Sequence, residues 1–439
     1  MTEEFVNGTH VEVFDQNEKG ALYSALAVGT LISCLLIMKL IRKFGGRLTF
    51  LSYGLISGIA TMFFPIGTNY GIVPAVFLRA MQGIGNGMPF ASIGYVSAAW
   101  CPLKASGVFL TALTAYNQLA PLMTMPLAGY FCTSSFGWKG IYYLQGFLTI
   151  IVFIFFYSVY KDQPRFHQRV SDKELVMIEH KKSVMSVDGK CSLPPVPYME
   201  IIKDPSTIGT LFICFGDFFC FNIFVLFAPI YLNKVLGLNI ADTGIASAFP
   251  YLGSLVLKTF VGPFSDGLTS ISTLTSVRLF MTLSQFPMTL ALITLAIIPP
   301  TWIFVAQLSY FCAIVFSAFG AVGYYKSVQL SAGPFSSVIM SWASIIYSII
   351  ILVLPIFKTI VAGDDQPDQW RLIFVVAAAI SFVTLGIWLF TVKVDLRPWA
   401  IIESTNSWKN SSLTKENLTN KIVPKIVIEK DSKLENVEI

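Results

Sequence analysis

Long apolar stretches recur along this chain from Ala21 to Phe390, separated by short connections. A helix needs roughly 20 mostly apolar residues to cross the hydrocarbon core of a bilayer. Only 13% of the residues are charged, whereas a water-soluble globular chain carries about 25%. The sequence therefore predicts an all-α, polytopic membrane protein. Its spans, about eleven at this helix length, are predicted at Ala21–Ile41, Leu48–Thr68, Ile72–Trp100, Ser106–Phe131, Trp138–Tyr160, Thr207–Leu232, Thr243–Phe264, Val277–Ile298, Trp302–Tyr324, Ser336–Val361 and Arg371–Val392.

Lysines and arginines gather on alternate connections between the predicted spans. The first and the long fifth connection are rich in them, as is the tail after Val392, whereas residues 363–370 are acidic. Because basic loops stay in the cytosol, we expect a cytosolic C-terminus and a luminal or extracellular N-terminus. The membrane of residence is expected to be the plasma membrane or a vesicular or lysosomal membrane.

The N-terminal segment carries one modification motif on the predicted outer side. Asn7-Gly8-Thr9 is an acceptor pattern for N-glycosylation. No secretory signal peptide precedes Asn7 to carry this end across the membrane. Either the first span inverts without help, or a preceding helix is missing from this chain, and we favour the second explanation.

A hydrophilic linker divides the predicted spans into five and six. Within it, "SDKELVMIE" is typical of a short surface helix capped by Ser171, with Glu174 at the capping-box position. A missing leading helix would make the two halves equal, which is the arrangement of transporters built from repeated halves. The predicted division is an N-terminal segment at 1–20, a helical bundle at 21–160, the cytosolic linker at 161–205, a second bundle at 206–394 and a cytosolic tail at 395–439.

Several stretches, in this order, resemble one known family. They are "RAMQGIGNGMPF", "DQPRFHQRVSDKELVMIE", "APIYLNKVLGLNIADTGIASAFPYLGSL", "DQWRLIFVVAAAI" and "RPWA". Together they resemble the anion:cation symporters of the major facilitator superfamily, collinearly from about Glu18 to Ala400. The resemblance implies the major facilitator fold, two six-helix bundles, with the first helix absent here. It also implies transport of a small organic or inorganic anion, coupled to H⁺ or Na⁺.

The cytosolic turns of the two halves differ in how closely they follow the family. The first turn has Met38 and Arg42 where members usually carry glycine and an acidic residue. The turn of the second half keeps Gly262 and Asp266. We expect Gly262, Asp266 and Arg42 to take part in gating, with the second turn holding the inward gate shut.

Arg79 is the most informative single residue. An arginine at bilayer depth costs roughly 2.5 to 3.5 kcal/mol on insertion scales unless it meets a cavity or a partner. Gln82 and Asn86 follow at i+3 and i+7 and so share its helical face. Gly83 and Gly87 form an adjoining stripe that lets another helix approach. A guanidinium facing water can capture a carboxylate or phosphate with two hydrogen bonds.

Asp217 and Asn222 lie in another apolar stretch, and Asn117 precedes Pro121 in a third. Asp217 aligns with a substrate-binding arginine of the family, and Asn86 with a glutamate linked to proton coupling. The carboxylate of Asp217 is open to three interpretations: a partner of Arg79, a proton or cation site, or a group facing a vestibule. An Arg79–Asp217 pair could also lock the two halves together without binding a ligand. The predicted substrate site comprises Arg79, Gln82, Asn86, Asn117, Asp217 and Asn222.

Lys258 and Lys326 lie near the cytosolic ends of their predicted spans. Lysines in this position extend their stems along apolar surface and keep the ammonium in water. We therefore expect both lysines to reach the cytosolic interface rather than to contact substrate.

The same sequence argues against several other functions. It has no phosphate-binding loop, no catalytic thiol setting and no Cys/His metal spacing. Its basic face suits lipid headgroups rather than nucleic acid, and no cofactor is expected. The predicted function is secondary active transport, not enzymatic catalysis. The alternatives are a non-transporting or truncated relative that acts as a regulatory or interaction protein and, with less support, an ion channel.

Overall fold

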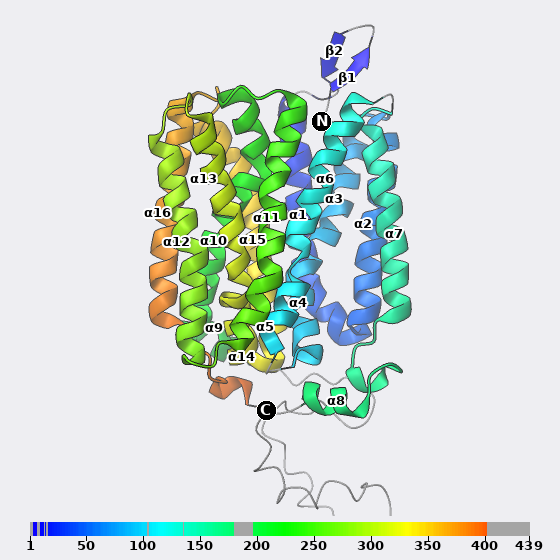
Figure 1. Ribbon diagram of the computed structural model, residues 1–439. Helices are drawn as coiled ribbons and strands as arrows, with labels where there is room; N and C mark the ends of the chain where they lie inside the picture. The colour runs from blue at the N-terminus through cyan, green and yellow to red at the C-terminus, as the bar shows by residue number, and fades with distance from the viewer. Residues whose placement is uncertain are drawn as a thin grey trace, which may run out of the picture. The chain divides into compact units, whose positions relative to one another are not determined.

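The computed structural model describes residues 3–6, 9–12, 14, 16–102, 105–134, 136–179 and 196–401. Within residues 1–400 the long helices run side by side between two faces (Figure 1). The antiparallel strands β1 (Glu3–Val6) and β2 (Thr9–Glu12) lie at one of them, called here the hairpin face. The opposite face, where α8 (Asp172–Glu179) lies, is called the linker face.

The first bundle precedes the linker. Two of its predicted spans are interrupted: one at Gly87, just before Pro89, and the other at Thr114, where the hydroxyl donates back to the Leu110 carbonyl. A proline in the first turn removes a backbone donor, and a threonine bonded to its own helix favours a bend. The helices are α1 (Gln16–Phe44), α2 (Gly46–Thr68), α3 (Ile72–Asn86), α4 (Met88–Trp100), α5 (Ser106–Leu113), α6 (Tyr116–Thr133) and α7 (Lys139–Val159).

The second bundle follows the linker. Between its fourth and fifth spans the chain passes through a short, buried and polar helix, α14, where the sequence predicted only a connection. The helices are α10 (Pro205–Ile230), α11 (Ile240–Gly267), α12 (Thr273–Ile297), α13 (Ile303–Phe316), α14 (Tyr324–Ala332), α15 (Ser336–Val361) and α16 (Pro367–Thr391). The short α9 (Tyr198–Lys203) leads into α10 at the linker face.

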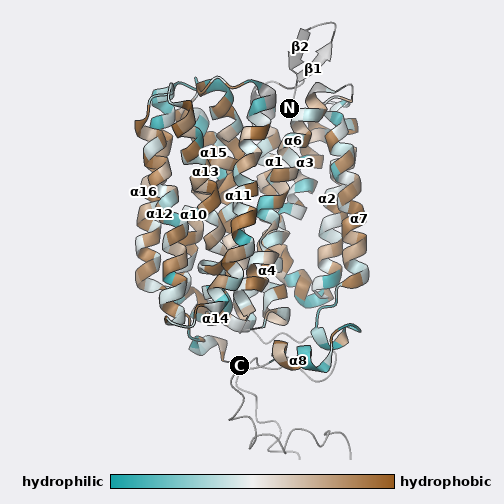
Figure 2. Ribbon diagram, in the orientation of Figure 1, coloured by the Kyte–Doolittle hydropathy of each residue, from teal (hydrophilic) through white to brown (hydrophobic). Residues whose placement is uncertain are grey.

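The predicted spans coincide with these helices. Among the described residues, 8 helices are long and apolar enough to cross a membrane, and one of them, Ile303–Val361, is 59 residues long and holds two spans. The interrupted pairs α3–α4 and α5–α6 supply the remaining two. Outward-facing helices such as α7, α12 and α16 are mainly hydrophobic along their length, and the ends are more hydrophilic (Figure 2).

Two local predictions are confirmed. In the linker, the Ser171 N–H donates to Glu174 Oε2 (3.0 Å) and the Glu174 N–H donates to Ser171 Oγ (3.4 Å), which is a capping box. In the first bundle, Gly83 and Gly87 lie against α1, where an added Cβ would collide with Leu26 and Ser33. Glycine is needed at both places because the two helices approach so closely.

The two bundles differ in their cores. The second bundle contains one large cluster of buried residues, including Ile213, Met281 and Trp388. The first bundle has two smaller clusters, one around Phe50 and one around Phe64. The bundles meet where α1 and α4 pack on α15, and where α5 and α6 pack on α11.

Candidate functional site

Arg79 lies on α3 and faces the inside of the protein. Its Nη1 donates to Gln82 Oε1 (3.0 Å) and its Nη2 donates to the Tyr142 hydroxyl (2.7 Å). The guanidinium also stacks 4.3 Å above the Phe64 ring. Both hydrogen-bonded partners are neutral, so they fix the direction of the guanidinium without cancelling its charge.

A cavity of about 620 Å³ adjoins this guanidinium. Its walls come from both bundles and carry aromatic rings as well as amides. The predicted residues Arg79, Gln82, Asn86 and Asn222 all line it. We call it the Arg79 cavity; its other walls include Phe14, Tyr23, Phe64, Trp138, Tyr142, Gln145 and Tyr347.

A second cavity, of about 330 Å³, adjoins the first and is called the Asp217 cavity. Asn86, Asn222 and Tyr347 line both cavities. Asn117 and Asp217 line the second one. The six predicted site residues are thus gathered on two adjoining cavities between the bundles.

Asp217 is held by a chain of side chains in the second bundle. Gln285 Nε2 donates to Asp217 Oδ1 (2.6 Å), and Ser381 Oγ donates to Gln285 Oε1 (2.8 Å). Asp217 is therefore bonded to Gln285, and Arg79 to Gln82 and Tyr142. The alternative in which an Arg79–Asp217 pair locks the halves together is not the arrangement in this structure.

The two asparagines between the charged groups are held within their own bundles. Asn86 Nδ2 donates to Thr30 Oγ1 on α1 (3.4 Å). Asn222 Nδ2 donates to the Phe218 carbonyl one turn earlier (2.7 Å). Each still lines the shared wall of the two cavities, where an amide can bond a passing ligand.

Lys258 is not at the interface, so the expectation for this residue is wrong. Its side chain is 4% exposed, and its Nζ donates to the Thr114 carbonyl (2.8 Å) and to Gln118 Oε1 (2.8 Å). Both acceptors belong to the other bundle, at the break between α5 and α6, and Lys258 also lines the Asp217 cavity. The one signal for this contact in the sequence is Gln118, a second amide directly after Asn117.

Lys326 is buried as well, which is the second correction. Its Nζ lies 2.9 Å from Asp266 Oδ1, and it also donates to Ser265 Oγ (3.0 Å). The carboxylate of Asp266 further accepts the N–H groups of Gly107 (2.8 Å) and Val108 (2.9 Å), at the start of α5 in the other bundle. Asp266 thereby joins the two bundles at the linker face.

The other two expected gating residues lie in different surroundings. Gly262, on α11, lies against α5, where an added Cβ would collide with Thr111 and crowd Val108. Arg42 is exposed in the last turn of α1. The turn after it is tied to the start of the linker, because the Arg47 N–H donates to Asp162 Oδ1 (2.8 Å).

Further contacts close the linker face between the bundles. Ser97 Oγ of α4 donates to Gln329 Oε1 of α14 (2.6 Å), and Gln329 Nε2 donates back to the Ser97 carbonyl (3.1 Å). Ser336 Oγ donates to the Gly94 carbonyl (3.1 Å). These contacts lie at the linker face, whereas residues at the start of α7, near the hairpin face, line part of the Arg79 cavity.

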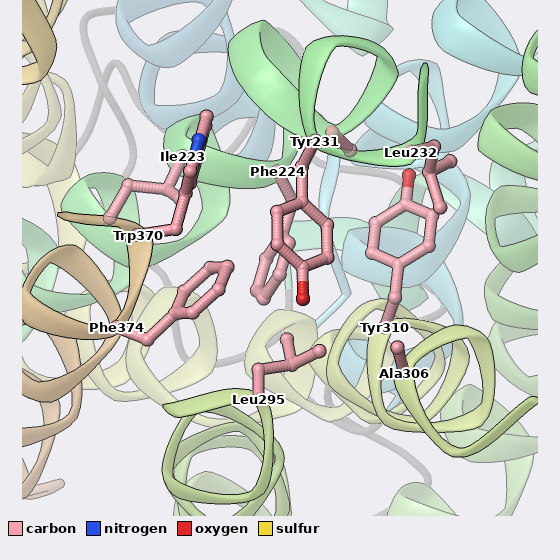
Figure 3. Close-up of a pocket in the computed structure, with 10 residues that line it drawn as sticks. Ile223, Phe224, Tyr231, Leu232, Leu295, Ala306, Tyr310, Trp370 and Phe374 are labelled. Carbon is pink, nitrogen blue, oxygen red and sulfur yellow. The ribbon is translucent and has the colours of Figure 1, made fainter. Parts of the chain in front are cut away.

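The aromatic crevice of the second bundle and the predicted glycosylation site at Asn7 do not contribute to the candidate site. Figure 3 shows a crevice in the second bundle lined by Tyr231, Tyr310, Trp370 and Phe374, but its volume of about 10 Å³ admits no more than about one water. Asn7, the predicted glycosylation site, lies outside the described residues.

Comparison with known proteins identifies the fold and the family. Residues 5–331 match the profile of the Major Facilitator Superfamily. A proton:xylose symporter, XylE, has the same fold with a TM-score of 0.61 and 14% identity, over 83% of this chain and 86% of that one. A bacterial homologue of the iron transporter ferroportin also has a TM-score of 0.61, with 12% identity, over 86% of this chain and 91% of that one.

Curated relatives narrow this further. Human sialin is 24% identical over 366 residues, which cover 82% of this chain and 72% of sialin. Sodium-dependent phosphate transport protein 3 of Mus musculus is 22% identical over 404 residues, covering 87% and 80%. Vesicular glutamate transporter 2.2 of Danio rerio is 22% identical over 370 residues, covering 83% and 62%. The chain therefore belongs to the major facilitator superfamily, and its resemblance to the anion:cation symporters of that superfamily is confirmed.

Proposed function

We propose that this protein is a secondary active transporter of a small organic anion and that it works by alternating access between the two bundles. Arg79 carries this proposal, because its guanidinium is held by neutral side chains on the wall of a 620 Å³ cavity. An unneutralised cation inside a membrane protein marks a pathway for its counter-ion.

The shape of the guanidinium favours a carboxylate or a phosphate. Five N–H donors lie in one plane, and the contacts with Gln82 and Tyr142 occupy a donor on each terminal nitrogen. The remaining donors can form the paired hydrogen bonds that such anions accept. In a site shielded from bulk water, losing such a charge-assisted contact costs about 2–5 kcal/mol.

The walls of the Arg79 cavity favour an organic rather than a bare inorganic anion. Phe64 and Tyr142 flank the guanidinium, and Trp138 and Tyr347 complete an aromatic surface around it. Such rings gain contact area from a carbon skeleton but offer little to a fully hydrated ion. The names of two relatives specify phosphate and glutamate, which are both anions.

The contacts at the linker face support the alternating mechanism. Asp266, Gln329 and Ser336 join the bundles on one side of the cavities. The structure would then be the state open at the hairpin face. In the transport cycle these contacts break while others form across the Arg79 cavity. From the distribution of lysine and arginine we place the linker face in the cytosol.

Uptake into proteoliposomes tests the proposal. We would measure labelled glutamate, phosphate and phenylacetate, with an imposed gradient of either H⁺ or Na⁺. Arg79→Ala should lower the uptake of a transported anion by at least about thirtyfold, which corresponds to roughly 2 kcal/mol. Arg79→Lys should recover only part of it, because an ammonium lacks the planar fork.

Arg371→Ala is the matched control, since Arg371 is 45% exposed and pairs only with Asp368 at the start of α16 among the described residues. It should transport as the wild type does. Wild-type uptake that survives Arg79→Ala would remove the central assignment. Absence of uptake for every anion would favour a regulatory relative over a carrier.

A further inference from the structure

We propose that Asp217 and Lys258 form a second, proton-coupled anion site, at which the anion replaces the Asp217 carboxylate as counter-ion of Lys258 once Asp217 is protonated. The inference rests on the proposed function and deepens it by naming H⁺ as the coupling ion. It assigns to Lys258 a role that the sequence did not suggest.

Lys258 has the chemistry of an anion site. Its two hydrogen bonds go to neutral oxygens, those of Thr114 and Gln118. An ammonium has three N–H donors, so the contacts with the other bundle leave one for a ligand in the Asp217 cavity, which Lys258 lines. A negative charge nearby stabilises a buried ammonium, and Asp217 interacts with Lys258 electrostatically.

The environment of Asp217 directs where a proton can go. Gln285 Oε1 already accepts from Ser381, so the amide presents its N–H to Asp217 Oδ1. That oxygen is thereby kept as an acceptor. Oδ2 of Asp217 is therefore the oxygen that can take a proton from water in the cavity, forming an O–H bond. When that bond breaks later in the cycle, the proton returns to water.

The remaining groups around Asp217 are uncharged at neutral pH. They are Gln285 of α12, Tyr324 and Tyr325 of α14, and Cys214 and Cys220 of α10 itself. Among the described residues that act on it, Lys258 of α11 is the charged one. The charge state of the Asp217 cavity is therefore set by this one pair.

Arg79 and Asp217 are too far apart for one small anion to touch both. Asn86 and Asn222 line both cavities; Arg79 lies seven residues from the first and Asp217 five from the second. At 1.5 Å per residue these offsets are about 10 Å along α3 and about 8 Å along α10, and Arg79 and Asp217 each line only one of the two cavities. The two cations therefore act in series, Arg79 first and Lys258 second.

Counting charges shows why a proton must accompany the anion. The empty protein holds Arg79⁺, Lys258⁺ and Asp217⁻, a net charge of one. An anion on Lys258 beside an ionised Asp217 would leave two adjacent negative charges in a cavity of low dielectric. With Asp217 protonated, the net charge equals that of the empty protein. One proton is then carried with each monovalent anion.

Proteoliposomes loaded with a pH indicator test this inference. With glutamate, phosphate and phenylacetate as probes, wild-type protein should accumulate the transported monovalent anion up to about tenfold per unit of pH gradient, because one pH unit is a tenfold ratio. Addition of that anion should also acidify the interior, and Na⁺ should not be required. In Asp217→Asn, accumulation and acidification should both disappear, whereas exchange of labelled for unlabelled anion should persist.

Lys258→Gln should lower exchange and accumulation by at least tenfold, because the second site loses its cation. Lys358→Gln is the matched control: Lys358 lies in the last turn of α15 and pairs with Asp365 after the helix ends, and this variant should leave both as in the wild type. If Asp217→Asn does not give monodisperse protein, Asp217→Glu replaces it and should retain coupling with a displaced pH profile.

The outcomes separate this inference from the proposed function. The proposed function is wrong if the wild type shows no uptake, or if Arg79→Ala retains wild-type uptake. Three results would overturn only the coupling site, provided that uptake still depends on Arg79. They are uptake that follows the pH gradient in Asp217→Asn, uptake driven by Na⁺ instead of H⁺, and an unchanged pH profile in Asp217→Glu.

Discussion

The two bundles of this protein hold their shape in different ways. In the most apolar part of each long span, the buried share is 44%, 44% and 11% for α1, α2 and α7 of the first bundle. It is 61%, 39%, 56% and 44% for α10, α11, α12 and α16 of the second. The second bundle has one large cluster of buried residues and a small one around Phe280, and its aromatic crevice holds a void of about 10 Å³. The clusters of the first bundle around Phe50 and Phe64 are smaller, and the Arg79 cavity adjoins the latter.

This difference indicates that the two bundles have different mechanical roles. A closely packed interior has few rearrangements available to it, so the second bundle is suited to move as a rigid body. The first bundle contributes most of the walls of the Arg79 cavity and the cation itself. Its rigidity depends on close backbone contact between α1 and α3 and on the contacts with the second bundle.

The largest effect is expected from a cavity in the core of the second bundle. Trp388 is fully buried, and Trp388→Ala should lower the free energy of unfolding by about 3–5 kcal/mol. Phe155 on α7 is 67% exposed, and Phe155→Ala should cost much less because few protein contacts are lost. Thermal unfolding in detergent would measure both. Equal losses would contradict the contrast between the bundles.

The next effect concerns the contact that joins the bundles at the linker face. Asp266→Ala removes the acceptor of Gly107 and Val108 and leaves Lys326 buried without its carboxylate. We expect a loss of about 3 kcal/mol, because an uncompensated buried charge is costly. Adding Lys326→Ala should restore part of the stability, while Lys203→Ala, at an exposed position on α9, should change little. A double mutant no more stable than Asp266→Ala would show that the ion pair is not the cause.

A third test addresses how the first bundle is held together. A Cβ at Gly83 would collide with the Leu26 backbone of α1, so Gly83→Ala should force the helices apart and cost about 1–3 kcal/mol. Gly129 of α6 has no atom within 4 Å of an added Cβ. Gly129→Ala should therefore be neutral or stabilise by up to about 1 kcal/mol, through helix propensity. Thermal unfolding should show a lower midpoint for Gly83→Ala and an unchanged or higher midpoint for Gly129→Ala.

The sequence could predict those features that depend on local interactions. Span positions, the Ser171–Glu174 capping box and the Gly83–Gly87 stripe each depend on spacing within one helix. The inward direction of Arg79 also follows from local rules, because Gln82 shares its face and a charge at that depth needs water or a partner.

The positions of Lys258 and Lys326 could not be predicted in this way. Hydropathy treats a lysine near the end of a span as one that reaches the interface. Their actual partners lie far away in the sequence: Thr114 exposes its carbonyl at the break between α5 and α6, and Asp266 is on another helix. No local pattern brings these groups together, so only the packing of the bundles reveals them.

The smallest effect is expected from an ion pair at the base of the second bundle. The Asp204 carboxylate, 5% exposed, accepts hydrogen bonds from the Arg397 guanidinium, from Trp399 Nε1 (2.8 Å) and from the Ser206 N–H (3.0 Å). Burial alone would raise the pKa of Asp204, but these hydrogen bonds outweigh it and lower the pKa below its usual range. Asp204→Asn should cost about 1–2 kcal/mol at neutral pH, the scale of hydrogen bonds to a charged group.

The sign of the pKa shift fixes the pH dependence. A carboxyl group with a lowered pKa in the folded state stabilises the fold above its unfolded-state pKa, about 3.9 for aspartate, and loses this contribution as the pH falls through the lower, folded-state value. The stability difference between wild type and Asp204→Asn should thus be full at pH 7 and shrink only in acid. Arg165 and Glu179, in the linker after the first bundle, form the matched exposed pair at 38% and 28% exposure. Arg165→Ala should change stability by about 0.5 kcal/mol or less. A larger loss there than at Asp204 would mean that the linker, rather than the base of the second bundle, is the more firmly held element at this face.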